Sequence, residues 1–116
     1  MLSLSAHQTY FVFSGIADMR NSFDGLSGLV RNKLDRDPVS SDVFVFFNRT
    51  RTQVKLLCWD QDGFAVYHKR LERGVYELIS GNNESSISIN SQTLSLILQG
   101  IIISSIKKKK RHTIAA

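Results

Sequence analysis

Short apolar runs separated by polar turns predict the strands of this chain. Tyr10–Phe13 is a β-branched and aromatic run that stops at a Ser-Gly pair, which is typical of a strand. Asp42–Asn48 is apolar at every position between its polar ends, so we expect a strand that is covered on both faces. Gln53–Trp59 and Phe64–Leu71 follow, with a tight turn between them, and predict two more strands. We expect the last three strands to form an antiparallel meander.

Two stretches of the chain have the spacing of amphipathic helices. Before the first, Ser22 is a candidate N-cap, and Asp24 lies in the first turn, where the helix dipole favours an anion. Gly25 and Gly28 each weaken a helix by about 1 kcal/mol relative to alanine, so this helix must depend on packing against the rest of the fold. We expect the two glycines to allow the helix to approach the sheet closely. Pro38 ends this unit. The apolar stripe consists of Phe23, Leu26, Leu29, Val30 and Leu34.

The region after the meander predicts a loop, a short strand and the second helix. The polar segment 79–86 is expected to be an exposed loop, and Ile87–Ile89 a short strand. Asn90 or Ser91 is placed to cap the second helix, and Gly100 to end it. The apolar positions of this helix are Leu94, Ile97 and Leu98.

These elements predict an α+β fold in one domain, residues 1–106, with an antiparallel meander sheet packed by one or two helices. A flexible basic tail is expected at residues 107–116. A length of 116 residues, with 42% hydrophobic and 22% charged residues, suits one folded domain. No apolar run reaches the roughly 18 residues of a membrane span, and the start of the chain lacks the features of a secretory signal. We therefore expect a cytoplasmic protein that does not associate with membranes.

All of the excess positive charge lies in the C-terminal tail. Of the 15 Lys and Arg residues, five form Lys107–Arg111, which leaves ten basic against 10 acidic residues elsewhere. Such a tail binds phosphates by releasing counterions, although basic ends without this role are common. Arg49 and Arg51 lie in the loop between the first two meander strands; they either make forked contacts to phosphates or belong to a solvated turn. Lys69 and Arg70 either contact phosphates or form a charged edge that prevents aggregation.

The turn between the last two meander strands determines which side chains share a face. We predict a three-residue loop, Gln61–Gly63, with Gly63 in the left-handed position of a bulge. The resulting register places Trp59 beside Ala65, Leu57 beside Tyr67 and Lys55 beside Lys69 on one face. Such a mixture of aromatic and basic groups stacks bases and neutralises phosphates on single strands. The alternative is that the aromatics are half-buried core residues with the lysines extended over them.

The predicted nucleic-acid contacts combine this face, the arginine loop and the tail. They are Arg49, Arg51, Lys55, Trp59, Tyr67, Lys69, Arg70, Lys107, Lys108, Lys109, Lys110 and Arg111.

No set of residues in the sequence predicts catalysis, a cofactor or a metal site. The single cysteine, Cys58, falls on the core side of its strand, and the three histidines are far apart in the sequence. Four aspartates are candidate ligands of the two Mg²⁺ ions of a nuclease, but a turn or a helix start accounts for three of them. These four are Asp18, Asp24, Asp60 and Asp62.

Several segments of the chain resemble the TnpB-type accessory proteins of the insertion sequence 66 family of bacterial transposons. The similarity covers about residues 3 to 111 and is carried by Gly15–Leu26, Asp42–Asn48, Lys55–Phe64 and Tyr67–Gly74. The family stretch D-M-R-K-S-F-D-G-L is matched by Asp18–Leu26, except that Asn21 replaces its lysine. The doubled arginine of the family appears as Arg49 and Arg51 around Thr50, and its helical L-x-x-L-L-x-G as Leu94, Ile97, Leu98 and Gly100. In the family an aromatic-proline pair often follows a G-x-F segment, and this pair is missing after Tyr76.

This resemblance implies an accessory protein of transposition, encoded beside a larger transposase that carries the catalytic acids. Our first hypothesis is a non-enzymatic factor that binds transposon DNA, or the transposase on DNA. The second is a protein-interaction or dimerisation module, in which the apolar strand Val43–Phe47 or a sheet edge docks the transposase or a second copy. The third, a metal-dependent nuclease, is the one we do not expect.

Overall fold

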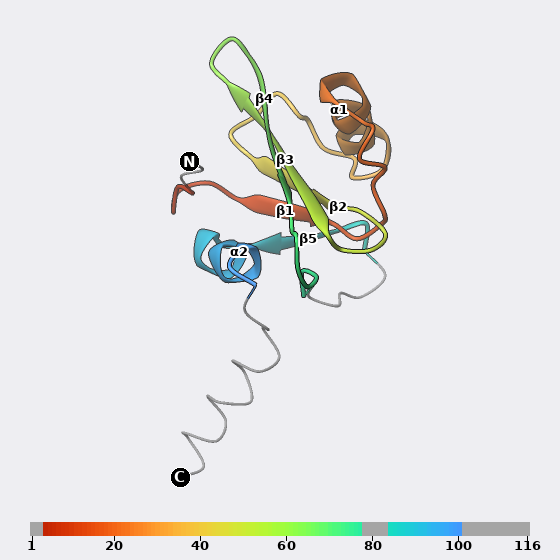
Figure 1. Cartoon of the computed structure of the whole chain (residues 1–116). Coiled ribbons are helices and arrows are strands. Elements are labelled where there is room, and N and C mark those ends of the chain that lie inside the picture. Colours follow the sequence, from red (N-terminus) through yellow and green to blue (C-terminus); the bar gives the residue numbers. More distant parts are fainter. Residues whose placement is uncertain (1–3, 78–83, 101–116) are drawn as a thin grey trace.

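The strands form one five-stranded sheet in the order β4-β3-β2-β1-β5 (Figure 1). The computed structural model describes residues 4–77 and 84–100. Within them the strands are β1 (Tyr10–Phe13), β2 (Val43–Phe47), β3 (Gln53–Asp60), β4 (Gly63–Arg70) and β5 (Ser86–Ile89), and the helices are α1 (Phe23–Asn32) and α2 (Ser91–Leu98). The predicted α+β class is confirmed, as are all the predicted strands and both helices.

The meander β2-β3-β4 is antiparallel, as predicted. The position of β1 was not predicted: it lies beside β2 and parallel to it, with Phe11 level with Phe44. Since α1 lies between these two strands in the chain, β1, α1 and β2 form a crossover unit of the kind that parallel pairing requires. The short strand β5 pairs antiparallel with the other side of β1.

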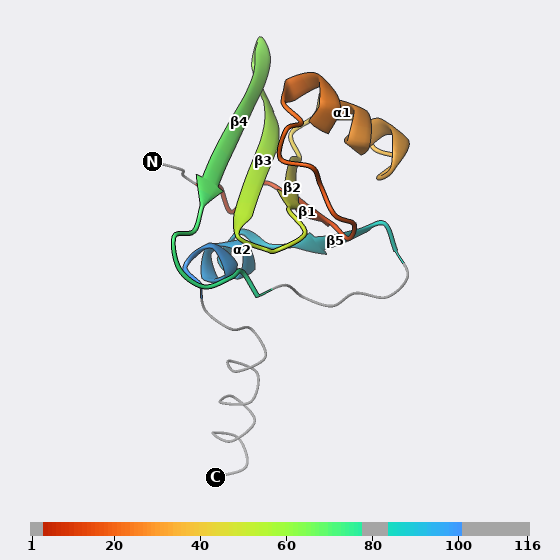
Figure 2. The same cartoon turned by 45° about the vertical axis from the view of Figure 1, so that its right-hand side comes forward.

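Each face of the sheet carries its own core under one helix. On one face, Leu26 and Val30 of α1 pack on Phe44, Phe46 and other side chains of the sheet. On the other face, α2 supplies Leu94 and Ile97, which pack with Val45, Phe47, Tyr76 and further residues. Figures 1 and 2 show the two helices on opposite sides of the sheet. Because successive side chains of a strand point to opposite faces, all five residues of β2 are buried.

The first helix differs from the prediction at its start. Leu26, Val30 and Leu34 are buried as expected, but Phe23 is 46% exposed. Ser22 occupies the N-cap position as predicted, but its side chain accepts no hydrogen bond from the backbone of the helix.

The expectation that the two glycines of α1 permit close packing on the sheet is wrong. A Cβ atom added at Gly28 would meet nothing within 4 Å. At Gly25 it would collide with the Asn21 side chain, which precedes the helix, and not with a strand.

The turn between β3 and β4 has two residues and not three. Asp60 pairs with Gly63, and Gln61 adopts the left-handed conformation with φ of 57° that we had assigned to Gly63. The predicted register is therefore shifted by one residue: Trp59 pairs with Phe64, Leu57 with Val66 and Lys55 with His68. Since the side-chain period of a strand is two, this shift moves the β4 side chains to the opposite face from the one predicted.

The two ends of α2 agree with the prediction from the sequence. The Asn90 side chain caps α2 by accepting from the Thr93 N–H at 2.8 Å, and Gly100 follows the helix with φ of 81°. Most of the predicted loop at 79–86, the boundary at residue 106 and the basic tail lie outside the described residues.

Candidate nucleic-acid interface

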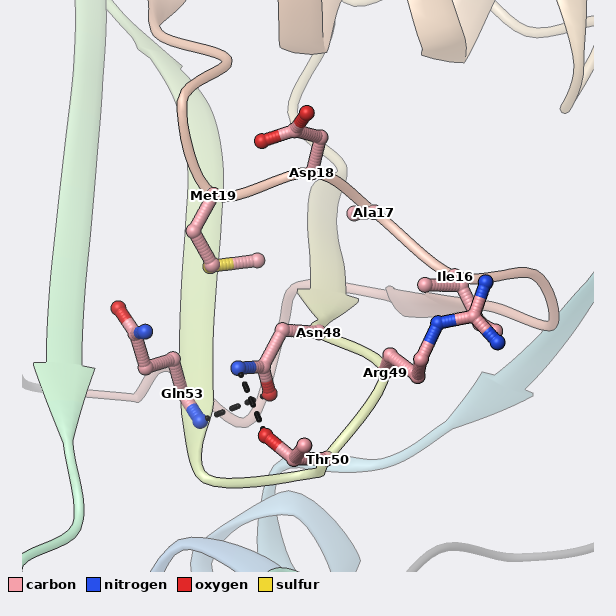
Figure 3. Close-up of a pocket in the computed structure, with 8 residues that line it drawn as sticks. All are labelled: Ile16, Ala17, Asp18, Met19, Asn48, Arg49, Thr50 and Gln53. Carbon is pink, nitrogen blue, oxygen red and sulfur yellow. Dashed lines mark hydrogen bonds between the residues drawn. The ribbon is translucent and has the colours of Figure 1, made fainter.

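The exits of the two parallel strands define the candidate site. Because β1 and β2 run in the same direction, the segments that leave them meet at one end of the sheet. The Ala17 N–H donates to the Phe47 carbonyl oxygen at 3.0 Å and joins these segments. A hollow of about 490 Å³ lies between them (Figure 3). It is lined by Ile16, Ala17, Asp18, Met19, Asn48, Arg49, Thr50 and Gln53.

The arginine loop, residues 48–52, is held in one shape by the Asn48 side chain. Asn48 Oδ1 accepts from the N–H groups of Thr52 at 2.9 Å and Gln53 at 3.0 Å. Its Nδ2 donates to the hydroxyl oxygens of Thr50 at 3.2 Å and Thr52 at 3.1 Å. On the outer side, the Tyr76 N–H donates to the Arg51 carbonyl oxygen at 2.7 Å. The loop is thus held by hydrogen bonds of its own residues and by one bond from Tyr76, and Arg51 takes a left-handed φ of 57° within it.

Arg49 and Arg51 are exposed at the end of this loop. Within residues 4–77 and 84–100, neither arginine has an acidic partner, since the ion pairs found there join Arg20 to Asp18 and Arg70 to Glu72. A guanidinium without a carboxylate partner keeps its forked donors available to an external anion.

The neighbouring loop adds a third arginine. The Arg20 guanidinium donates to both carboxylate oxygens of Asp18, from Nη2 at 2.6 Å and from Nε at 3.0 and 3.1 Å. These hydrogen bonds lower the pKa of Asp18 to about 2. Asp18 is therefore the ion-pair partner of Arg20, and the Arg20 side chain remains 92% exposed.

Lys55 was predicted to contact phosphates, and the structure places it inside the protein. Only 7% of the residue is exposed. Its Nζ donates to the carbonyl oxygens of Met19 at 2.8 Å and Asn21 at 2.6 Å. Lys55 therefore fixes the segment that leads into α1 and does not present its charge to solvent.

The predicted face of aromatic and basic side chains does not form. In the observed register Trp59 and Lys55 lie on the α1 side of the sheet, whereas Tyr67 and Lys69 lie on the α2 side. Trp59 instead packs edge-on against Phe64, with 5.0 Å between the ring centroids. Trp59 lies six positions after Gln53, about 20 Å along a strand, so it is also remote from the arginine loop.

The remaining predicted basic residues have separate environments. Arg70 is exposed, pairs with Gln53 across the ladder at the end of the sheet near the arginine loop, and forms an ion pair with Glu72 at 3.1 Å. Lys69 is exposed on the other face. The tail residues Lys107 through Arg111 lie outside the described residues.

His68 lies across the ladder from Lys55 on this side of the sheet. Its pKa is lowered by partial burial and by the positive charges of Lys55 and Arg70. His68 Nε2 lies 2.8 Å from Oε1 of Gln53, a residue that also lines the hollow. This histidine was not among the predicted site residues, because the predicted register assigned it to the other face.

The described residues contain no group of three His, Cys, Asp or Glu side chains placed to hold a metal ion. No helix in this part of the chain is long and apolar enough to span a bilayer.

Comparison with known proteins gives one family. The family described as "IS66 Orf2 like protein" matches residues 8–108. Two proteins of Sinorhizobium fredii (strain NBRC 101917 / NGR234) are also similar. "Uncharacterized protein y4hO" is 31% identical over 101 residues, which is 87% of each chain, and "Uncharacterized protein y4jC" is 29% identical over 98 residues, which is 83% of each chain. No solved structure matches significantly.

Proposed function

The chain belongs to the IS66 Orf2-like family of insertion-sequence proteins, and on this premise we propose that it is a non-enzymatic accessory factor of transposition that binds DNA through the arginine loop. The single observation that carries the proposal is the pair Arg49 and Arg51, exposed on a loop whose shape the Asn48 side chain fixes.

The surroundings of the loop support the same role. Arg20 and Arg70 are exposed at this end of the sheet, each with one carboxylate partner on the surface. Exposed ion pairs of this kind contribute at most about 1 kcal/mol, so a phosphate can compete for either guanidinium. The tail Lys107–Arg111 is a further predicted contact, because five adjacent positive residues bind a polyanion without sequence preference.

The test is the salt dependence of DNA binding. The full chain is titrated with a labelled transposon-end duplex and with single strands, and affinity is measured by fluorescence anisotropy at two ionic strengths. Arg49→Ala/Arg51→Ala removes two positive charges from the loop, and Arg31→Ala/Lys33→Ala removes two from the far end of α1 as a matched control. For duplex DNA, two lost phosphate contacts reduce the slope of log K against log salt by about 1.8.

Three results would contradict this proposal. One is the absence of binding at low salt, and another is an unchanged slope in the arginine-loop variant. The third is an equal loss in the control variant, which would mean that net charge alone determines the affinity.

The separate transposase of the same element is the second partner we propose, by docking to this protein on DNA or without it. The docking site suggested by the sequence, the apolar strand Val43–Phe47, is wrong because this strand is central and buried. A sheet edge is the alternative surface. Co-sedimentation of the two purified proteins with and without DNA tests the interaction. The absence of co-sedimentation in both mixtures contradicts it.

The non-enzymatic character of the protein is part of the proposal and has its own test. We expect no cleavage of plasmid DNA in the presence of Mg²⁺. Cleavage that disappears in Asp60→Ala or Asp18→Ala would replace the accessory role with a nuclease.

A further inference from the structure

The outer edge of β4 carries a row of backbone groups that the sheet itself does not use. β4 is the first strand in the sheet order, and in Figure 2 it forms the outer margin, with α1 and the other strands on its inner side. The Leu71 N–H donates to the Thr52 carbonyl oxygen, which identifies this pair as hydrogen-bonded. Because bonded and non-bonded pairs alternate along an antiparallel ladder, the backbone groups of Phe64, Val66, His68 and Arg70 point away from β3.

The charges along this edge are arranged with opposite signs at its two ends. At the start of β4 lie Asp62, in the turn that precedes the strand, and Asp60, the last residue of β3, both exposed. The end of β4 carries Lys69 and Arg70, also exposed. Lysine and arginine on a sheet edge ordinarily discourage pairing with another edge. On this strand they are offset by acids one strand length away.

We propose that a second copy of this chain pairs antiparallel with the β4 edge, so that one sheet continues through a two-fold symmetric dimer. Antiparallel pairing brings the acidic start of one copy level with the basic end of the other. The proposal uses the β4 edge and does not depend on DNA binding.

The directions of the backbone groups limit the register. Outward-pointing residues must face one another, and two registers satisfy this with nearly full overlap. In the first, Val66 lies opposite Val66 of the other copy, which places Phe64 opposite His68 and Asp62 opposite Arg70. In the second, Val66 lies opposite His68, and Arg70 faces Phe64, so no acidic residue of the other copy lies directly opposite Arg70. The first register joins opposite charges twice, once at each end, and is the one we infer.

The side chains of the edge suit this pairing. Phe64, Val66 and Tyr67 are only partly buried, so each has apolar surface left to cover. The ion pair of Arg70 with Glu72 at 3.1 Å has both side chains exposed, and an exposed pair of this kind is weak enough to be exchanged for Asp62 of the second copy.

Charge reversal tests the register directly, on DNA-free full-length protein by sedimentation equilibrium at low ionic strength. In Arg70→Glu or Asp62→Arg alone, both end contacts of the dimer join like charges, and we expect the dimer dissociation constant to rise about tenfold. An equimolar mixture of the two variants restores both contacts in the mixed dimer, so the mass returns to that of the wild-type dimer. Arg31→Glu, with the same change of net charge on α1, leaves the wild-type dissociation constant unchanged.

Every other result overturns the proposal. A wild-type chain that remains monomeric at the highest concentration refutes the dimer. A dimer insensitive to both reversals is formed by another surface. The inferred register is excluded if both variants dimerise more weakly than the wild type but their equimolar mixture does not form the mixed dimer, while circular dichroism shows that both are folded. None of these results bears on the arginine loop.

Discussion

Lys55→Met is the substitution that most directly tests how the end of the sheet is built. The wild-type ammonium is buried and donates to the carbonyl oxygens of Met19 and Asn21 at 2.8 and 2.6 Å. Methionine has a similar length and no donor, so it preserves most of the packing and leaves both carbonyls without this partner.

The magnitude follows from the two opposing terms. Hydrogen bonds to a charged group contribute about 1.5–3 kcal/mol each. The variant also escapes the cost of keeping a charge away from water, which is several kcal/mol for an ion that is fully buried. With two bonds lost and part of this cost recovered, we expect a net destabilisation of about 2–3 kcal/mol, or a fall of roughly 10 °C in Tm for a domain of this size.

Urea unfolding followed by the fluorescence of Trp59, the single tryptophan, measures the change. Lys69→Met is the control, because Lys69 is exposed and has no hydrogen bond within the described residues. Equal free energies of unfolding for both variants and the wild type, within about 0.5 kcal/mol, would refute the assigned role of Lys55.

Two further predictions concern α1 and the loop before it. Gly28→Ala should stabilise the protein by about 1 kcal/mol in thermal unfolding, because the added methyl group meets open space. Gly25→Ala should give no such gain, because its methyl group collides with the Asn21 side chain. An equal gain in stability from both substitutions would contradict this geometry. The pKa of Asp18, about 2 in the folded protein against 3.8 for the ordinary carboxyl, predicts that the contribution of its pairing to stability is complete above about pH 4 and is lost as pH falls towards 2. An NMR titration of the Asp18 carboxyl should have its midpoint near 2, and Arg20→Ala should return it towards the ordinary value; a midpoint unaffected by that substitution would mean that Arg20 is not the cause.

Local patterns predicted the elements of this fold because each element is specified by neighbouring residues. The unbroken apolar run of β2 indicated a strand covered on both faces, and all five residues are buried. Asn90 and Gly100 marked the two ends of the second helix, and the structure confirms both positions.

The pairing of strands that are distant in the sequence could not be predicted from local patterns. Nothing in Tyr10–Phe13 indicates that this strand lies parallel to β2 and between β2 and β5. The side chains that line the hollow come from two segments about thirty residues apart, and they meet only because these strands are neighbours.

The register error had a local cause with a large effect. Glycine is the usual residue at a left-handed turn position, so Gly63 was the natural choice, yet Gln61 occupies that conformation. One residue of difference in the turn separated Trp59 from Tyr67 and removed the predicted stacking face. Lys55 gave one signal that sequence reasoning can use: it stands between Val54 and the apolar run Leu56–Trp59 of a predicted strand. A lysine in such a place must find acceptors inside the protein.

The position of α2 has a consequence for the protein during its synthesis. The strands β1 to β4 and α1 leave the ribosome before β5 and α2, which together cover Tyr10, Val12 and Val45. Until Leu94 and Ile97 emerge, the apolar side chains on one face of the nascent sheet remain exposed to water, and incomplete chains in this condition tend to aggregate. A message truncated ahead of residue 84 would therefore yield an insoluble product even though four of the five strands were translated intact.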